Sequence, residues 1–235
     1  MKVYVINLDC AKERMASVDS QLKRLGVKYE RVSAVDARAM SEEARMRAVN
    51  RFRWWCAVGR RVEPAEVGCA LSHKGIYERM GQGEFVCILE DDVVVESSFP
   101  EQLREVEQVV DAAKAQVYML SNRGDLIKGE GIVRSRFAFC TDGYVITKAA
   151  ADAIIRANYP IMTPCDYWGR WVKQGLVELF HVLPPSISQN QELFGSSTQG
   201  EMQYVKDYPI GKWLVHKAKR LVGRSIDKFL LGIHR

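Results

Sequence analysis

The chain has 235 residues, of which 47% are hydrophobic, and 34 Lys and Arg against 29 Asp and Glu give it a net charge of +5. This length and composition are typical of one or two globular domains. The charge is uneven, because residues 212–235 hold seven basic side chains and one acid, which leaves residues 1–211 at −1. A nucleic-acid-binding protein of this size usually spreads cations over a folded face, so the near-neutral body argues against a nucleic-acid partner.

The sequence indicates neither a secretory leader nor a spanning helix. Its first apolar run, residues 3–8, is too short for the core of a signal peptide and is followed by charged residues. No run approaches the roughly 18 apolar residues that a spanning helix needs, so we expect a soluble or at most surface-bound protein. Because the six cysteines have no CxxC spacing, we expect reduced thiols in the cytoplasm rather than disulfides or a zinc site.

Hydrophobic periodicity predicts a β-α-β opening. Residues 3–8 suit a buried strand, residues 11–25 have apolar side chains at helical spacing, and Gly26 ends this helix. Residues 27–35 favour a second strand. Parallel sheets with nucleotide sites are built from such units.

The rest of the chain continues this alternation, with a more mixed C-terminal third. We expect irregular backbone over 50–63, a polar loop over 184–200, helices over 41–49, 64–80, 100–115 and 148–158, and strands over 85–89, 117–120, 132–136, 144–147 and 177–182. The pattern predicts an α/β fold in which a Rossmann-type mixed sheet is flanked by helices.

Three carboxylates, Glu90, Asp91 and Asp92, come directly after the apolar strand 85–89. Open α/β sheets present ligand-binding groups at this edge. Like charges there are costly unless a cation compensates, and Mg²⁺ or Mn²⁺ would do so while bridging diphosphate oxygens. If strand geometry continues, Glu90 and Asp92 point the same way and Asp91 the opposite way. The alternative is a solvated acidic turn with a helix-capping Asp.

Four segments, in this order and spacing, resemble glycosyltransferase family 25: VINLDCAKERM at 5–15, RVSAVDAR at 31–38, EVGCALSHKGIY at 66–77 and CILEDDVVV at 87–95. The likeness extends more loosely to about residue 200. This family includes bacterial lipooligosaccharide transferases, typically galactosyltransferases, and the collagen galactosyltransferases. The resemblance implies a GT-A-like fold, an inverting nucleotide-sugar transferase and a metal held by Glu90 and Asp92.

Further polar residues are candidates for binding the donor. The amide of Asn7 could read a uracil edge, Arg14 could meet the diphosphate, and Asp36 could hold ribose hydroxyls, as acids do at that point in dinucleotide folds. Their alternatives are a turn Asn, a surface Arg and a helix-capping Asp. Asp91 of the acidic segment belongs to this set, and the resemblance adds Gln189 to it.

Ser72 and His73 follow each other on the helix expected over 64–80, where they could orient the donor phosphate or sugar. A lone His is more often a satisfied structural residue. Because sequence neighbours on a helix do not face each other, we do not expect a nucleophile and base pair here.

Inverting transfer needs one general base near the acceptor hydroxyl. Asp166 is our candidate, since the aromatic residues that follow it, Tyr167, Trp168 and Trp171, could stack on a sugar ring. The alternative is a capping Asp with the Trp side chains in the core. Asp142 stands where the family usually has Thr-Ala or Thr-Ser before its Gly-Tyr pair. This departure makes it an acceptor contact or a second candidate base.

Residues 206–235 predict a basic amphipathic C-terminal helix that follows a catalytic domain over 1–205. At about 100° per residue, apolar side chains between Val215 and Ile233 fall on one face and basic side chains on the other. Such a helix can lie on an anionic membrane, or it can dock its apolar face on the catalytic domain.

The expected function is transfer of a sugar, galactose from UDP-galactose, to a lipooligosaccharide or other cell-surface glycan or glycolipid. The cofactor would be Mn²⁺ or Mg²⁺. We expect the protein in the cytoplasm, peripheral to the cytoplasmic face of the inner membrane. Two other classes stay open: a metal-dependent nucleotidyltransferase or phosphohydrolase, and a non-enzymatic membrane-associated interaction protein.

Overall fold

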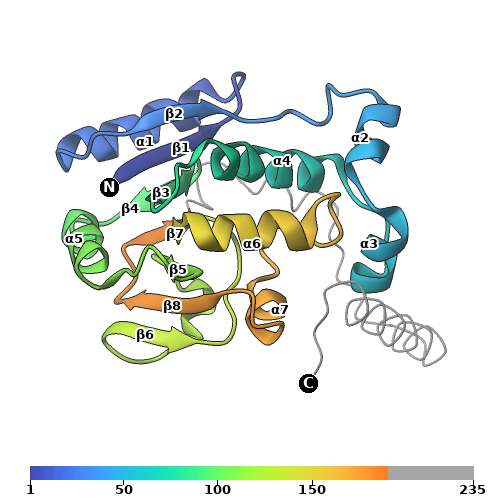
Figure 1. Cartoon of the computed structure of the whole chain (residues 1–235). Coiled ribbons are helices and arrows are strands. Elements are labelled where there is room, and N and C mark those ends of the chain that lie inside the picture. The colour runs from blue at the N-terminus through green and yellow to red at the C-terminus, as the bar shows by residue number, and fades with distance from the viewer. Residues whose placement is uncertain (190–235) are drawn as a thin grey trace.

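The structure, a computed structural model, describes residues 1–189 and centres on a sheet of seven strands in the order β2-β1-β3-β7-β5-β8-β6 (Figure 1). In chain order, the strands are β1 (Lys2–Asn7), β2 (Glu30–Ser33), β3 (Phe85–Glu90), β5 (Gln116–Met119), β6 (Gly131–Ser135), β7 (Gly143–Thr147) and β8 (Glu178–Leu183). Strand β1 is parallel to β2 and β3, while β7 is antiparallel to β3 and β5. Strand β8 is parallel to β5 and antiparallel to β6. The predicted α/β fold with a mixed sheet is confirmed.

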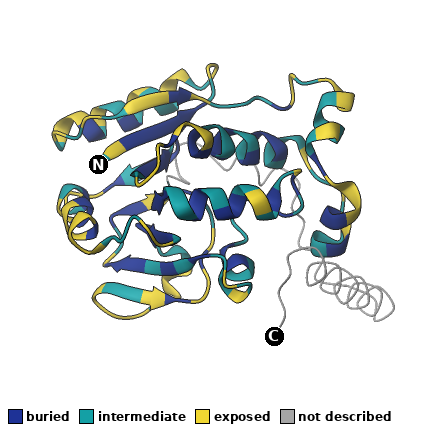
Figure 2. Cartoon of the chain, viewed as in Figure 1, coloured by how far each residue is buried: buried dark blue, intermediate teal, exposed yellow. Residues whose placement is uncertain are grey.

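Helices cover both faces of this sheet, because successive strand residues point to opposite sides. The helices are α1 (Lys12–Arg24), α2 (Glu42–Ala48), α3 (Arg51–Val58), α4 (Pro64–Arg79), α5 (Phe99–Val109), α6 (Lys148–Asn158) and α7 (Trp168–Lys173). Tyr4 and Ile6 share a core with side chains of α4, α6 and α7, whereas Val3 and Val5 pack with side chains of α1 and α5. Figure 2 shows the buried residues concentrated in the strands and on one side of the helices.

Helix α4 begins and ends close to its predicted bounds. Pro64 occupies the first turn, where its missing N–H costs nothing. Glu63 and Glu66 form a capping box, in which each side chain accepts a backbone N–H at the helix start. The buried side of this helix includes Ser72 and His73, so these candidates face inward.

The expectation of irregular backbone over 50–63 is wrong for residues 51–58, which form α3, and holds for residues 59–63. The side chain of Asn50 accepts the backbone N–H of Arg53 at 3.1 Å, which caps the helix start. Gly59 ends the helix at a φ of 84°, in the left-handed region. Trp54 is 1% exposed, so burial of one large side chain anchors this short helix.

Two expected elements are shorter than predicted. Strand β2 begins at Glu30 rather than 27, because the backbone N–H of Val27 closes the end of α1 on the carbonyl of Leu22 at 3.0 Å. Helix α5 ends at Val109 rather than 115. Asp111 begins a turn there, since its side chain accepts the N–H of Ala113 at 3.1 Å.

A second, two-stranded sheet was not predicted. It pairs β4 (Val93–Val95) with β9 (Ile187–Gln189) in antiparallel register. Strand β9 lies inside the segment expected to be a polar loop, and no element was predicted over 93–95. Within residues 1–189, no helix is long and apolar enough to cross a bilayer. The rest of the loop expected over 184–200 and the amphipathic helix expected over 206–235 lie outside the described residues.

Candidate functional site

The candidate site lies where strands of the large sheet end or begin at the same edge. Asn7 ends β1 and Glu90 ends β3, and these two strands are parallel. Asp142 directly precedes β7, which runs back antiparallel from Leu89 paired with Gly143. The backbone N–H of Glu90 donates to the carbonyl of Asp142 at 2.9 Å, which joins the two acidic segments.

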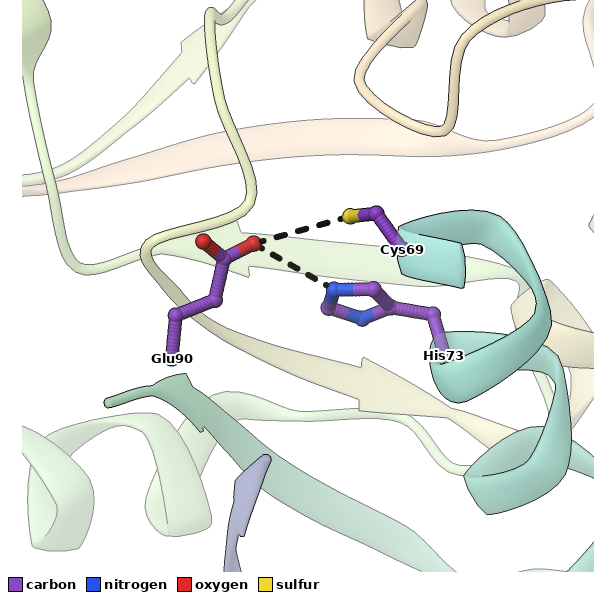
Figure 3. Close-up of side chains that lie close together, drawn as sticks. All are labelled: Cys69, His73 and Glu90. Carbon is purple, nitrogen blue, oxygen red and sulfur yellow. Dashed lines mark hydrogen bonds and ion pairs between the residues drawn. The ribbon is translucent and has the colours of Figure 1, made fainter. Parts of the chain in front are cut away.

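Glu90 faces helix α4 (Figure 3). Its Oε1 lies 3.4 Å from Nε2 of His73 and 3.9 Å from Sγ of Cys69, and it accepts a short hydrogen bond from Thr141. Burial lowers the pKa of His73, but Cys69 and Glu90 outweigh it and raise the pKa to about 9. Burial acts to raise the pKa of Glu90, and the bonds from His73 and Thr141 lower it overall. An imidazolium–carboxylate pair is therefore expected at neutral pH.

Asp91 and Asp92 lie in the turn after β3 and do not continue its alternation. Arg14 approaches both, with Nη1 3.5 Å from Oδ1 of Asp91 and 4.0 Å from Oδ2 of Asp92. The amide of Asn7 donates to Asp91 at 2.7 Å and is itself held by Arg31, whose Nε donates to its oxygen at 2.9 Å. The expectation that Glu90 and Asp92 share one direction, opposite to Asp91, required the strand to continue, and this condition is not met because β3 ends at Glu90.

Asp92 is 5% exposed and has one buried oxygen, Oδ1, without a hydrogen-bond partner. Its Oδ2 accepts from Nε2 of Gln189 at 3.1 Å, and the oxygen of Gln189 accepts from Arg123 at 2.8 Å. Burial, followed by the charge of Glu90, raises the pKa of Asp92. An unsatisfied buried carboxylate oxygen is costly unless a ligand or ion meets it.

Asp142 and Asp166 add two further acids to this cluster. Burial and then the charges of Glu90 and Asp92 raise the pKa of Asp142 to about 8, against the opposing effect of Arg123. Burial also raises the pKa of Asp166, which the backbone amide of Cys140 partly offsets. Glu90 raises the pKa of both candidate bases, so both border the same acidic centre, and the charge of Asp166 adds to the rise in the pKa of Asp142.

Helix α7 separates the two interpretations of the Asp166 segment. Its N-cap is Tyr167, so Asp166 does not cap it. Trp168 and Trp171 are 0% and 2% exposed and pack edge to face with ring centroids 5.2 Å apart. The expectation that these two Trp rings stack on a sugar is wrong, because they belong to the core, as the alternative held.

The remaining donor-binding candidates, Asp36, Ser72 and His73, line one cavity of about 120 Å³. This cavity is bordered by α4 and the acidic turn. Asp36 lines it and pairs with Arg38 at 3.0 Å. The hydroxyl of Ser72 donates to the carbonyl of Gly68 at 2.7 Å and accepts the N–H of Val35 at 2.8 Å. In this arrangement Ser72 fixes the segment before Asp36. His73 has other partners, so the two residues form no nucleophile and base pair.

The site residues that were not predicted include Cys69, Thr141 and Arg123. Cys69 precedes His73 by one helical turn, so a Cys-x-x-x-His spacing on a helix was a usable signal. Thr141 reaches Glu90 only because β7 pairs with β3. Arg123 lies in a short 3₁₀ turn, Arg123–Asp125, and its sequence context carries no signal for this contact.

Comparison with known proteins gives matches of two kinds. The sequence profile of glycosyltransferase family 25, described as an LPS biosynthesis protein, matches residues 1–126. Glycosyltransferase 25 family members of Anopheles gambiae and Aedes aegypti are 31% and 29% identical over 170 and 169 residues, 66% and 65% of this chain. The matched stretch spans only 28% and 27% of the length of these relatives. Among solved structures, the inositol-1-phosphate CTP transferase of T. maritima is 16% identical, with a TM-score of 0.40 over 77% of this chain and 84% of that chain.

Proposed function

Because the chain belongs to glycosyltransferase family 25, we propose that it is an inverting, metal-dependent transferase that moves galactose from UDP-galactose to a lipooligosaccharide or other cell-surface glycan. One observation carries this proposal: Glu90, Asp92, Asp142 and Asp166 gather at one edge of the sheet, with raised pKa values for the three Asp residues. Such a cluster needs a cation to hold an anionic leaving group.

The residues present fit a hard divalent cation, Mn²⁺ or Mg²⁺. Asp92 offers a buried carboxylate oxygen with no hydrogen-bond partner, and Glu90 offers a second carboxylate nearby. Carboxylate oxygens are the ligands that these ions prefer. When bound, the ion would neutralise the developing charge on the diphosphate. Glu90 and Asp92 are its proposed protein ligands.

The donor would meet the chain through groups that the sheet edge brings together. Arg14 supplies a guanidinium beside Asp91 and Asp92 for the diphosphate, and Asn7 is held rigidly by its bonds to Asp91 and Arg31. At about 120 Å³, the pocket is smaller than the 300–1,000 Å³ typical of whole-ligand sites. It therefore suits the diphosphate end, with Asp36 toward the ribose.

Asp166 is the proposed general base, which takes the proton of the acceptor hydroxyl as that oxygen attacks the anomeric carbon. Its raised pKa brings its basicity closer to neutrality. Asp142 is a weaker candidate, because a pKa of about 8 leaves it protonated at neutral pH in the arrangement described. We propose that the acceptor is a glycolipid at the cytoplasmic face of the inner membrane.

The direct test is a screen of nucleotide sugars with Mn²⁺, scored by release of nucleoside diphosphate and by the anomeric configuration of the product in NMR spectra. UDP-galactose should be turned over with inversion. Retention of configuration would contradict the mechanism. Consumption of a nucleoside triphosphate or a phosphate ester, without use of any nucleotide sugar, would instead favour a nucleotidyltransferase or phosphohydrolase.

The metal has a separate test by calorimetry. Mn²⁺ and UDP should each raise the affinity for the other by at least about 10-fold, a coupling of about 1.4 kcal/mol. Asp92→Ala should abolish this coupling, while Asp111→Ala, at a partly exposed acid after α5, should leave it unchanged. UDP affinity that is the same with Mn²⁺ and with chelator would remove the metal from the mechanism.

A further inference from the structure

Cys69, His73 and Glu90 converge from two elements onto one point beside the acidic cluster (Figure 3). Cys69 and His73 lie one turn apart on α4, and Glu90 ends β3. Their donor atoms, one sulfur, one ring nitrogen and one carboxylate oxygen, all lie within 4.8 Å of one another. We infer that these three side chains form a binding site for a thiophilic divalent cation of the Zn²⁺ class, distinct in chemistry from the proposed Mn²⁺ site.

The spacing of the donor atoms fits tetrahedral coordination. Zinc bonds of about 2.0–2.3 Å place neighbouring ligand atoms about 3.3–3.8 Å apart at the corners of a tetrahedron. Nε2 of His73 lies 3.4 Å from Oε1 of Glu90, and Sγ of Cys69 lies 3.9 Å from that oxygen. An ion can therefore be accommodated by small side-chain rotations.

Groups around the ligands orient them as in known metal sites. Nδ1 of His73 lies 2.7 Å from the hydroxyl of Tyr144, which in turn lies 2.6 Å from the hydroxyl of Tyr77. This bond engages Nδ1, so Nε2 is the ring nitrogen toward Glu90, and a metal ion that binds there displaces the Nε2 proton of the imidazolium. Thr141 donates to Glu90 and fixes its carboxylate. Hydrogen bonds of this kind set the tautomer and orientation of metal-binding His and carboxylate groups.

Cys165 lies close enough to Cys69 to be a fourth ligand. Its Sγ lies 3.2 Å from Sγ of Cys69, although the two residues are 96 positions apart in sequence. The cysteines have no zinc spacing along the chain, and the fold alone brings this pair together. Two sulfurs and an imidazole favour Zn²⁺, Co²⁺ or Cd²⁺, whereas the oxygens of Asp92 favour Mn²⁺ or Mg²⁺. Glu90 is a proposed ligand in both sets.

The test uses Co²⁺, which reports thiolate ligation by a near-ultraviolet charge-transfer band. The full-length protein, reduced and freed of metal with chelator, is titrated with Co²⁺ alone. We expect a saturable band at one ion per chain that Zn²⁺ abolishes by displacement. Cys69→Ser should remove most of the band, and the double variant Cys69→Ser, Cys165→Ser should remove all of it. The matched control Cys56→Ser, at a buried cysteine of α3, should keep it.

A second variant keeps all ligands and guards against misfolding as an explanation. Tyr144→Phe removes only the hydroxyl that holds His73, so Co²⁺ should bind about 10-fold more weakly with the band still present. Absence of the band in the wild type, or a band unchanged in Cys69→Ser, would overturn the inference. Binding of UDP with Mn²⁺ to the wild type is measured separately. If UDP and Mn²⁺ bind but the Co²⁺ band is absent, the inference fails and the proposed function, on which it does not depend, stands.

Discussion

The acidic side chains at the edge of the sheet suit the proposed cation site, but their mutual repulsion destabilises the folded protein when no cation is bound. Asp142 is 3% exposed, and Glu90, Asp92 and Asp166 all disfavour its charged form. Arg123 counters them only in part. Since the pKa of Asp142 rises from 3.8 to about 8 on folding, its ionisation destabilises the metal-free protein.

This shift predicts how stability depends on pH. The contribution of protonated Asp142 is fully present below pH 4 and is lost as the pH rises through 8, at up to about 1.4 kcal/mol per pH unit. Asp142→Asn cannot ionise, so its free energy of unfolding should fall less steeply and exceed that of the wild type at pH 8. Urea unfolding in chelator between pH 5 and 8 measures both. Parallel pH profiles of the two proteins would contradict the assigned pKa.

Asp166 and Asp142 can be separated by activity. Asp166→Asn should lower kcat about 10²–10⁴-fold, the range that a general base supplies, while UDP affinity in Mn²⁺ stays unchanged. Asp152→Asn, at an acid on α6 that pairs with Lys148 at 2.7 Å, is the matched control with wild-type kcat. Full turnover in the Asp166 variant would exclude it as the base.

A site residue could be predicted from the sequence where its position depends only on the strand or helix that contains it. Asn7 and Glu90 were each predicted to lie at the end of a buried strand, and the structure brings them to one edge because the two strands are parallel. The sequence did not predict that Glu90 and Asp92 have different hydrogen-bond partners, since these partners depend on the residue at which β3 ends. Thr141 and Cys165 reach the site through contacts between distant segments, which no local pattern encodes.

At the scale of elements, the close packing of α4 on the segment after β2 positions Asp36. A Cβ on Gly68 would lie 2.5 Å from the carbonyl oxygen of Val35 and 3.3 Å from the N of Ala37. The hydroxyl of Ser72 bonds the same segment. Absence of a side chain at 68 therefore permits the approach.

Two glycines of α4 should respond in opposite ways to the same substitution. Gly68→Ala forces backbone to shift and should destabilise the protein by about 1–3 kcal/mol. Gly75→Ala meets nothing within 4 Å and should stabilise it by about 0.5–1 kcal/mol, through helix propensity alone. Urea unfolding of both variants gives the comparison. Equal effects would show that the contact at 68 is not close.

The elements that were predicted and those that were missed differ in what determines them. Helix α4 has a Pro start, a capping box and a long apolar periodicity, all of which are local. Helix α3 spans eight residues and depends on burial of Trp54. Strands β4 and β9 have three residues each and form only because they pair with each other. Val93 pairs with Gln189 at one end of this short ladder. Such short, non-local pairs lack a periodic signal.

At the scale of the whole molecule, the net charge of +5 is a sum of unlike parts. Residues 1–211 are nearly neutral, and their acidic cluster at the sheet edge is the proposed site for a cation and, through it, a diphosphate. Residues 212–235 carry seven basic side chains and one acid. An anionic surface would therefore attract the C-terminal segment and leave the body without net attraction.

This division predicts that membrane binding and catalysis separate on truncation. The full chain should sediment with anionic vesicles, and binding should weaken with salt, because each cation near the surface contributes on the order of 1 kcal/mol. Residues 1–211 alone should lose vesicle binding but keep Mn²⁺-dependent UDP binding, since the described site residues lie within 1–189. Neutral vesicles are the control. If truncation leaves anionic-vesicle binding unchanged, the basic segment does not bind membrane, and its docking on the catalytic domain becomes the favoured interpretation.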